Sequence, residues 1–283
     1  MGFAAAMSVL AIFSLFLVIS VAETFSSISN NETPKKQTSS ISHEKKWLLT
    51  KIHGIAFVLA WFFFVPLAMA SARWGRAYLK QYTPMGLRLW YHAHRTLNII
   101  AVVLMIVGLA CIFIAHEWRW LGPKVGGERN NSSTAYHTMF GIFSVLLAWI
   151  QPFNSLLRCG LNHPLRALYN WVHRSIGLLS FLFAAIAIII ACVYFYKHVT
   201  NTQNAIIFCS LCFGVIVGAT LILEFAAWRG RKLKEPLLEN PESDKNFDSS
   251  AEHSVIQGAV FAISTILLTA FCSALCAIIA QKN

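Results

Sequence analysis

Long apolar runs separated by short polar segments make up most of this chain. Six runs cover residues 47–72, 92–115, 136–157, 171–196, 205–228 and 255–280. Each run is long enough to cross the hydrocarbon core of a bilayer, which takes about 20 helical residues. The pattern therefore predicts an all-α membrane protein built as a six-helix transmembrane bundle.

A seventh apolar run, residues 3–22, stands at the N-terminus and is followed by a polar stretch at 23–46. The run ends in Ser20, Val21 and Ala22, small residues suited to signal peptidase, so we interpret it as a signal peptide. It lacks a basic start, which leaves an uncleaved N-terminal anchor as the alternative. Either form places 23–46 outside the cytosol, in a multi-pass protein of the secretory pathway, at the plasma membrane or an endomembrane.

Composition agrees with lipid as the solvent. Of the 283 residues, 57% are hydrophobic and 12% are charged, whereas a soluble domain carries about 25% charged residues. The net charge of +11 is better explained by cytosolic loops and lipid headgroups than by nucleic acid. The seven cysteines follow no disulfide or zinc spacing, and we expect them to be small packing residues.

Basic residues and glycosylation sequons predict the orientation. If 23–46 is extracytoplasmic, three cytosolic segments carry cations without acids, at 73–88, 158–166 and 229–234. The sequons at Asn31, Asn130 and Asn131 fall in segments that this topology places outside. The predicted divisions are a signal peptide at 1–22, an extracytoplasmic segment at 23–46, a core at 47–228, a cytosolic linker at 229–254, and a sixth helix with its tail at 255–283.

Four histidines carry the functional prediction, because each lies near the N-terminal end of its predicted helix. His53 and His137 belong to helices that run inward, and His94 and His173 to helices that run outward. His53 and His137 should therefore lie near the outer face, and His94 and His173 near the cytosolic face. Each pair can present two imidazoles to one iron.

Haem is the group that these pairs fit. Ionisable side chains in hydrocarbon are costly and usually functional, and imidazole is a common axial ligand of haem iron. Two ligands at each depth are too few for a closed zinc site. No Asp, Glu or Cys stands beside the pairs to complete a zinc or copper site. We therefore expect two haem b groups in the central four helices.

Small residues follow each histidine along its helix face. They are Gly141, Ser144 and Ala148 after His137, Gly177, Ser180 and Ala184 after His173, Ala101 and Gly108 after His94, and Ala56 and Ala60 after His53. We interpret these faces as room for porphyrin, and close helix packing is the alternative. His92 competes with His94, but the two point to opposite helix faces, and the small residues follow His94.

The stretch from His53 to residue 196 resembles the cytochrome b561 family, in the form joined to a DOMON domain in ferric-reductase-like and plant redox proteins. The matching landmarks are His53-Gly54 with Trp61, Trp90 four residues before His94, Tyr136-His137, Gln151 leading to Arg158, and Asn170-Trp171-Val172-His173 with Gly177. The resemblance implies six helices, two haems in the central four, ascorbate as cytosolic donor, and ferric chelates or monodehydroascorbate as outer acceptor. Only about 24 residues precede the core, too few for a DOMON domain, so a separate extracytoplasmic redox partner or a small molecule is expected there.

Our hypothesis is that single electrons pass from a cytosolic reductant to an outer acceptor. The basic segment 73–88 would attract an anionic donor, unless its charge only sets the topology. Arg95 and Arg174 follow the cytosolic ligands and are candidates for haem propionates or lipid phosphates; Lys51 and Tyr136 are outer candidates. The alternatives are a haem-binding sensor or structural protein, and a solute transporter with histidines in a proton relay.

Overall fold

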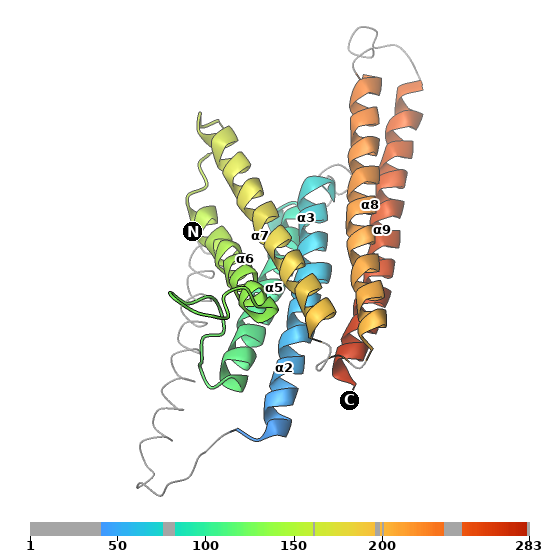
Figure 1. Ribbon diagram of the computed structural model, residues 1–283. Helices are drawn as coiled ribbons and strands as arrows, with labels where there is room; N and C mark the ends of the chain where they lie inside the picture. The colour runs from blue at the N-terminus through green and yellow to red at the C-terminus, as the bar shows by residue number, and fades with distance from the viewer. Residues whose placement is uncertain are drawn as a thin grey trace, which may run out of the picture. The chain divides into compact units, whose positions relative to one another are not determined.

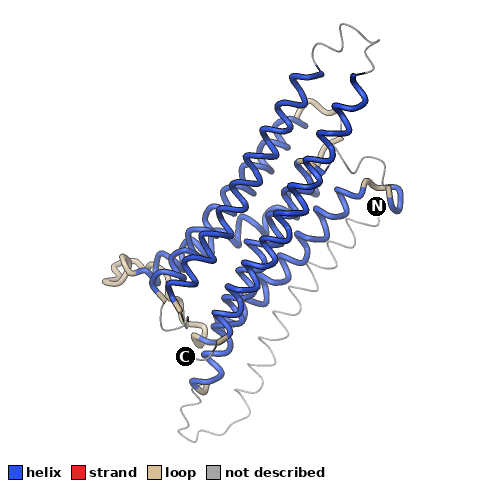
Figure 2. Tube along the Cα trace, turned by 90° about the vertical axis from the view of Figure 1, so that its right-hand side faces the viewer, coloured by secondary structure: helices blue, strands red, loops and turns tan. Residues whose placement is uncertain are grey.

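The computed structural model describes residues 41–75, 83–160, 162–195, 199, 201–234 and 245–281. The predicted signal peptide and residues 23–40 lie outside the described residues. Figure 2 shows helices and loops throughout the described chain and no strand. Side chains are described for all of these residues except 231–234 and 245–255.

Six helical spans in the described residues are long and apolar enough to cross a membrane, as the sequence predicted. They are His43–Arg73, Leu89–Ala115, Ser133–Leu156, Arg166–Tyr194, Thr202–Gly230 and Ile256–Ala280. The protein is therefore an all-helical membrane bundle.

The first span is not one regular α-helix. It consists of α2 (His43–Val58), the π-helical segment η1 (Leu59–Phe64) and α3 (Val65–Arg73). The Val65 amide donates to the Ala60 carbonyl, five residues back, as a π-helix requires. Pro66 follows directly and has no amide hydrogen for the carbonyl four residues earlier, so an α-helix is weakened here.

The next three spans are α5 (Leu89–Ala115), α6 (Ser133–Leu156) and α7 (Arg166–Tyr194). A short 3-10 turn, η2 (Pro84–Gly86), precedes α5. The Ala135 amide donates to the Ser132 hydroxyl at 3.2 Å, which caps the start of α6. These starts place His94, His137 and His173 within the first two turns of their helices, close to where the apolar pattern predicted them.

The chain divides into two compact units. Among the described residues, the first comprises 41–53 together with Ile106–Ala187, and the second comprises those of Gly54–Met105 and those from Ile188 onward. In the first unit, α6 and α7 lie side by side (Figure 1). The Ser180 hydroxyl donates to the Ser144 carbonyl at 2.6 Å, and both serines are 1% exposed.

The Ser144–Ser180 contact decides, at these two residues, whether the small side chains leave room for porphyrin or allow close helix packing. We expected the faces behind His137 and His173 to leave room for porphyrin. At Ser144 and Ser180 that prediction is wrong, because the two helices touch directly. Small side chains here permit close helix packing, the common use of such residues in membranes.

The second unit contains a hairpin of α8 (Thr202–Lys234) and α9 (Lys245–Ala280), which lie side by side (Figure 1). The Cys212 and Cys272 sulfur atoms are 3.7 Å apart inside the hairpin. The seven cysteines are free, and Cys192, Cys209, Cys212 and Cys272 are buried. The two helices extend into both ends of the predicted linker, so that only 235–244 separates them, outside the described residues.

Candidate haem sites

The structure brings His53 of α2 and His137 of α6 together in the first unit. Their ring centroids are 6.2 Å apart, and the ring planes meet at 68°. The two histidines are 84 residues apart in the sequence, so helix packing alone creates the pair.

Each ring of this pair is tethered to the backbone of a neighbouring helix. The His53 Nδ1 lies 2.9 Å from the Gly108 carbonyl of α5, and the His137 Nδ1 lies 2.9 Å from the Ala187 carbonyl of α7. Since a carbonyl only accepts, both Nδ1 atoms must carry the proton and donate. Each Nε2 is then the basic nitrogen, the form in which a neutral imidazole binds a metal.

The spacing of the pair fits a metal ion held between the rings. Two metal–nitrogen bonds of about 2 Å, together with the distance from each nitrogen to its ring centre, roughly account for 6.2 Å. A Cβ placed on Gly141, one turn after His137, would meet no atom within 4 Å. The described residues contain no cluster of three or more His, Cys, Asp or Glu able to hold a bare metal ion. Haem, which supplies four nitrogens of its own, suits a site with two protein ligands.

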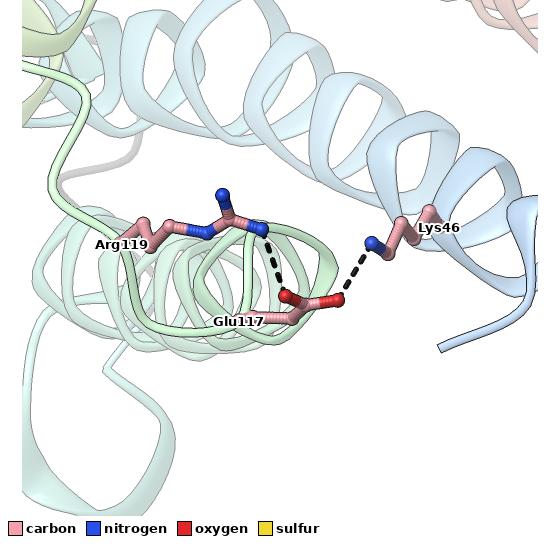
Figure 3. Close-up of polar contacts among 3 residues, drawn as sticks. All are labelled: Lys46, Glu117 and Arg119. Atoms are coloured by element: carbon pink, nitrogen blue, oxygen red, sulfur yellow. Dashed lines mark hydrogen bonds and ion pairs between the residues drawn. The ribbon is translucent and has the colours of Figure 1, made fainter. Parts of the chain in front are cut away.

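A cluster of charges joins the start of α2 to the turn after α5. Glu117 accepts from the Lys46 ammonium at 2.7 Å and from the Arg119 guanidinium at 2.8 Å (Figure 3). The hydrogen bond from Lys46, followed by the one from Arg119, holds the pKa of Glu117 below its usual range. The turn is tight, since Glu117 and Trp118 have φ of 53° and 58° without being glycine.

Lys51 lies two residues before His53 and is only 4% exposed. Its ammonium sits over the Trp47 ring, 3.3 Å from the centroid. A cation held against an aromatic face is stabilised most when water is excluded. Buried cations in membrane helices are rare and usually functional, which keeps Lys51 among the candidates.

His94 is tethered in the same way as His53 and His137. Its Nδ1 donates to the Ala68 carbonyl of α3 at 2.9 Å within the second unit. The Asn98 amide nitrogen lies 3.4 Å from this Nδ1 and 2.7 Å from the His94 carbonyl. An Nδ1 that donates to Ala68 cannot also accept, so the Asn98 amide bonds the carbonyl.

His92 lies elsewhere and makes a different contact. Its Nε2 is 3.0 Å from the carbonyl of Pro84, in the turn that precedes α5. In His94 the Nε2 atom remains available for a metal, whereas in His92 the Nε2 atom is bonded to the Pro84 carbonyl. The contacts favour His94 over His92 as the ligand.

His173 lies in the first unit, where the side-chain amide of Gln151 donates to its carbonyl at 3.1 Å. The His173 ring stacks on Tyr169, with centroids 6.2 Å apart and planes 7° from parallel. Gln151 therefore makes a structural polar contact between α6 and α7. His94 belongs to the other unit, so the His94–His173 pairing stays a prediction.

Three of the arginines that the sequence singled out, Arg73, Arg95 and Arg174, lie within the described residues. The Arg73 guanidinium makes a two-pronged ion pair with Glu224 of α8, at 2.7 and 2.9 Å. The segment 73–88 contains no acidic residue of its own, but Arg73 is paired with an acid 151 residues later in the sequence. Arg95 lies 5.9 Å from the Tyr91 ring centroid, and Arg174 is exposed; their propionate role stays a prediction.

Several buried polar atoms lack a hydrogen-bond partner within the described protein. They are the indole nitrogens of Trp61, Trp74 and Trp149, the Gln151 carbonyl oxygen and the Asn154 amide nitrogen. Trp61 is 2% exposed and Trp74 9% exposed, so water does not readily satisfy them. Buried polar groups normally have partners, and the carboxylates of a bound haem are acceptors that indole and amide nitrogens can use. Trp74, Trp149 and Asn154 were not singled out from the sequence, because nothing in the local pattern shows that their polar atoms are buried.

The sequence of this chain is similar to a known protein family and to several known proteins. A family model described as eukaryotic cytochrome b561 matches residues 52–197. Human ferric-chelate reductase 1 is 29% identical over 145 residues, which cover 50% of this chain and 22% of that protein. The mouse protein of the same name is 25% identical over 220 residues, 77% of this chain and 34% of that protein.

A plant relative shows the same likeness. A cytochrome b561 and DOMON domain-containing protein of Arabidopsis thaliana is 26% identical over 204 residues, 70% of this chain and 44% of that protein. The chain thus spans between about a fifth and under half the length of these curated relatives. No solved structure is significantly similar to it.

Proposed function

The chain belongs to the eukaryotic cytochrome b561 family, and from this premise we propose that it conducts single electrons across a membrane. Proteins of this family bind haem b, and the relatives named ferric-chelate reductase support a redox function. The observation that carries the proposal is the His53–His137 pair, whose rings stand 6.2 Å apart with both Nδ1 atoms tethered.

We assign one haem b to His53 and His137 and a second to His94 and His173. When bound, haem b supplies a reversible one-electron couple. The tethers on His53, His137 and His94 hold each ring in the tautomer that leaves Nε2 for iron. With both axial positions taken by histidine, the iron would have no open position for oxygen.

Charged side chains near the ligands are candidates to hold the haem carboxylates. Arg95 and Arg174 follow the cytosolic ligands, and Lys51 precedes His53. Arginine binds carboxylates through paired hydrogen bonds, and the buried Lys51 would be stabilised by an added negative charge. Trp61 and Trp74 offer further donors through their indole nitrogens.

The donor we propose is ascorbate on the cytosolic side, and the acceptor a ferric chelate or monodehydroascorbate on the other. The relatives whose names state a substrate are ferric-chelate reductases. An anionic donor suits the basic segment before α5, in which Arg88 is described and Arg76 and Lys80 lie outside the described residues. A separate extracytoplasmic redox partner is an alternative acceptor.

The test is a visible spectrum of the purified full chain in detergent, before and after ascorbate. We expect a low-spin haem spectrum with about two haems per chain, reduced by ascorbate. Haem that dithionite reduces and ascorbate does not would exclude ascorbate as donor and favour the sensor alternative. A folded chain without haem would refute the proposal.

A further inference from the structure

The π-helical segment η1 lies between two tether points on the first membrane span. Upstream, the His53 ring donates to Gly108 of α5, and downstream, the Ala68 carbonyl of α3 accepts from His94 of α5. The same two spans, His43–Arg73 and Leu89–Ala115, therefore carry both tethers. The upstream tether positions His53, a proposed ligand of one haem, and the downstream tether positions His94, a proposed ligand of the other.

The two spans use different numbers of residues between these tethers. The step from His53 to Ala68 is fifteen residues, and the step from His94 to Gly108 is fourteen. The first span carries one residue more than its partner.

That single residue matters because of helix phase. An α-helix turns by about 100° per residue, so fourteen residues end roughly 40° short of four full turns. This is the drift of about 20° per heptad that two packed helices absorb by a slight supercoil. Fifteen α-helical residues would end roughly 60° beyond four turns, about 100° away from the face that α5 presents.

The π-helix removes this mismatch. Its bonds run from each amide to the carbonyl five residues back, as from Val65 to Ala60, so one turn holds about one residue more than an α-helical turn. One extra residue is absorbed without rotating the α-helix downstream of it. Ala60, Trp61 and Phe62 of the segment are 0%, 2% and 0% exposed, so packing encloses it.

We propose that η1 is a phase-setting insertion that positions the His53 and His94 tethers on the same face of the first span. Pro66, which cannot donate to the carbonyl four residues back, lowers the preference for α-helix at this point. The inference rests on the proposed function in that His53 and His94 are taken as haem ligands. It adds that a residue count in the first span controls whether both rings are correctly held.

Two variants of the full chain test the proposal. In the first, Phe63 is deleted and Pro66→Ala is added, so that fourteen residues can form a regular α-helix between the tethers. In the second, one alanine is inserted after Phe63, so that the span carries sixteen. Pro66→Ala alone leaves the count at fifteen and is the background control for the deletion.

Haem content, the electron paramagnetic resonance signals of low-spin haem and the midpoint potential of each haem are measured for every variant. We expect the deletion variant to fold and keep the haem content, signals and potentials of its Pro66→Ala background. The insertion should lose about half of the haem, or weaken haem binding by roughly tenfold or more at one site, since displacing the hydrogen-bond partner of a ligand has that effect.

A deletion variant that loses a haem, shifts its signal or fails to fold would overturn the inference. If the extra residue only sets the phase, the span without it should form a regular α-helix and keep both tethers. Equal haem loss in the deletion and insertion variants would overturn it too. Absence of haem from the unaltered chain is a different result, since it refutes the proposed function itself.

Discussion

The histidine-bearing helices and the α8–α9 hairpin are both apolar, yet they are held in different ways. In the first region, imidazole rings donate to backbone carbonyls of neighbouring helices, at Gly108, Ala187 and Ala68. In the hairpin, the Cys212 and Cys272 sulfur atoms are in contact, and the buried Ser264 hydroxyl donates to the Phe261 carbonyl of its own helix. The family match covers 52–197 and ends before the hairpin begins.

This difference separates a region built to hold a group from one built to pack. An imidazole in a lipid-filled environment must have its polar atoms satisfied, so its ring is fixed by specific partners. Small apolar and thiol side chains have no such demand and tolerate exchange. Substitutions should therefore change haem properties in the first region and only stability in the second.

The largest expected effect is the loss of one haem on removal of a ligand. His137→Ala deletes one imidazole of the His53–His137 pair, and we expect the haem content to fall by about half. The matched control is His43→Ala, which removes an exposed histidine at the start of α2. Haem content is measured per chain by pyridine haemochrome. Equal haem in His137→Ala and the unaltered chain would remove this region from consideration as a haem site.

A second substitution tests the tether without touching a ligand. Gly108→Leu adds a side chain to the residue whose carbonyl accepts from His53, and we expect haem affinity at that site to fall by roughly tenfold. Gly218→Leu in α8 is the control, because a Cβ there would meet no atom within 4 Å. Haem retention during dilution and a potentiometric titration distinguish the two variants. If both behave alike, the Gly108 tether has no role in haem binding.

A smaller effect is expected from the hairpin. Cys272→Ala removes a sulfur that is in contact with Cys212, in a residue that is 1% exposed. The small cavity should cost roughly 1 kcal/mol of stability, seen as a lower thermal midpoint in detergent. The haem spectrum and potentials should stay unchanged, and a shift in either would contradict the separation of the two regions.

The smallest effect concerns the charge cluster at Glu117. Glu117→Gln removes the negative charge that Lys46 and Arg119 share, and we expect a slightly lower thermal midpoint at pH 7. The folded-state pKa of Glu117 is below its unfolded value, so its stabilisation is full above the ordinary Glu pKa of about 4.3 and is lost as pH falls through the folded value.

The thermal midpoints of the Glu117→Gln variant and the unaltered chain should therefore converge in acid. High salt should reduce the difference at pH 7, since exposed ion pairs are screened. A difference that persists unchanged below the folded pKa of Glu117 would mean that packing, rather than charge, holds the turn.

Much of the fold could be predicted because its physics is local. The six spans follow from apolar length alone, and the alternating direction of the helices places His53 and His137 at the same depth. The small faces were harder, since Gly, Ala and Ser suit both a haem slot and close packing, and Ser144 with Ser180 proved to pack.

The sequence by itself determined that this is a helical membrane protein with candidate ligands in four helices, because apolar length and histidine positions suffice for those two conclusions. Its spaced landmarks added the resemblance to the cytochrome b561 family, which the family match over 52–197 bears out. The tertiary structure alone decided which carbonyl each imidazole reaches, that Glu224 pairs with Arg73, and that η1 interrupts the first span. Every residue has a carbonyl, so no sequence pattern marks the one that accepts a hydrogen bond. Only the register of packed helices selects it.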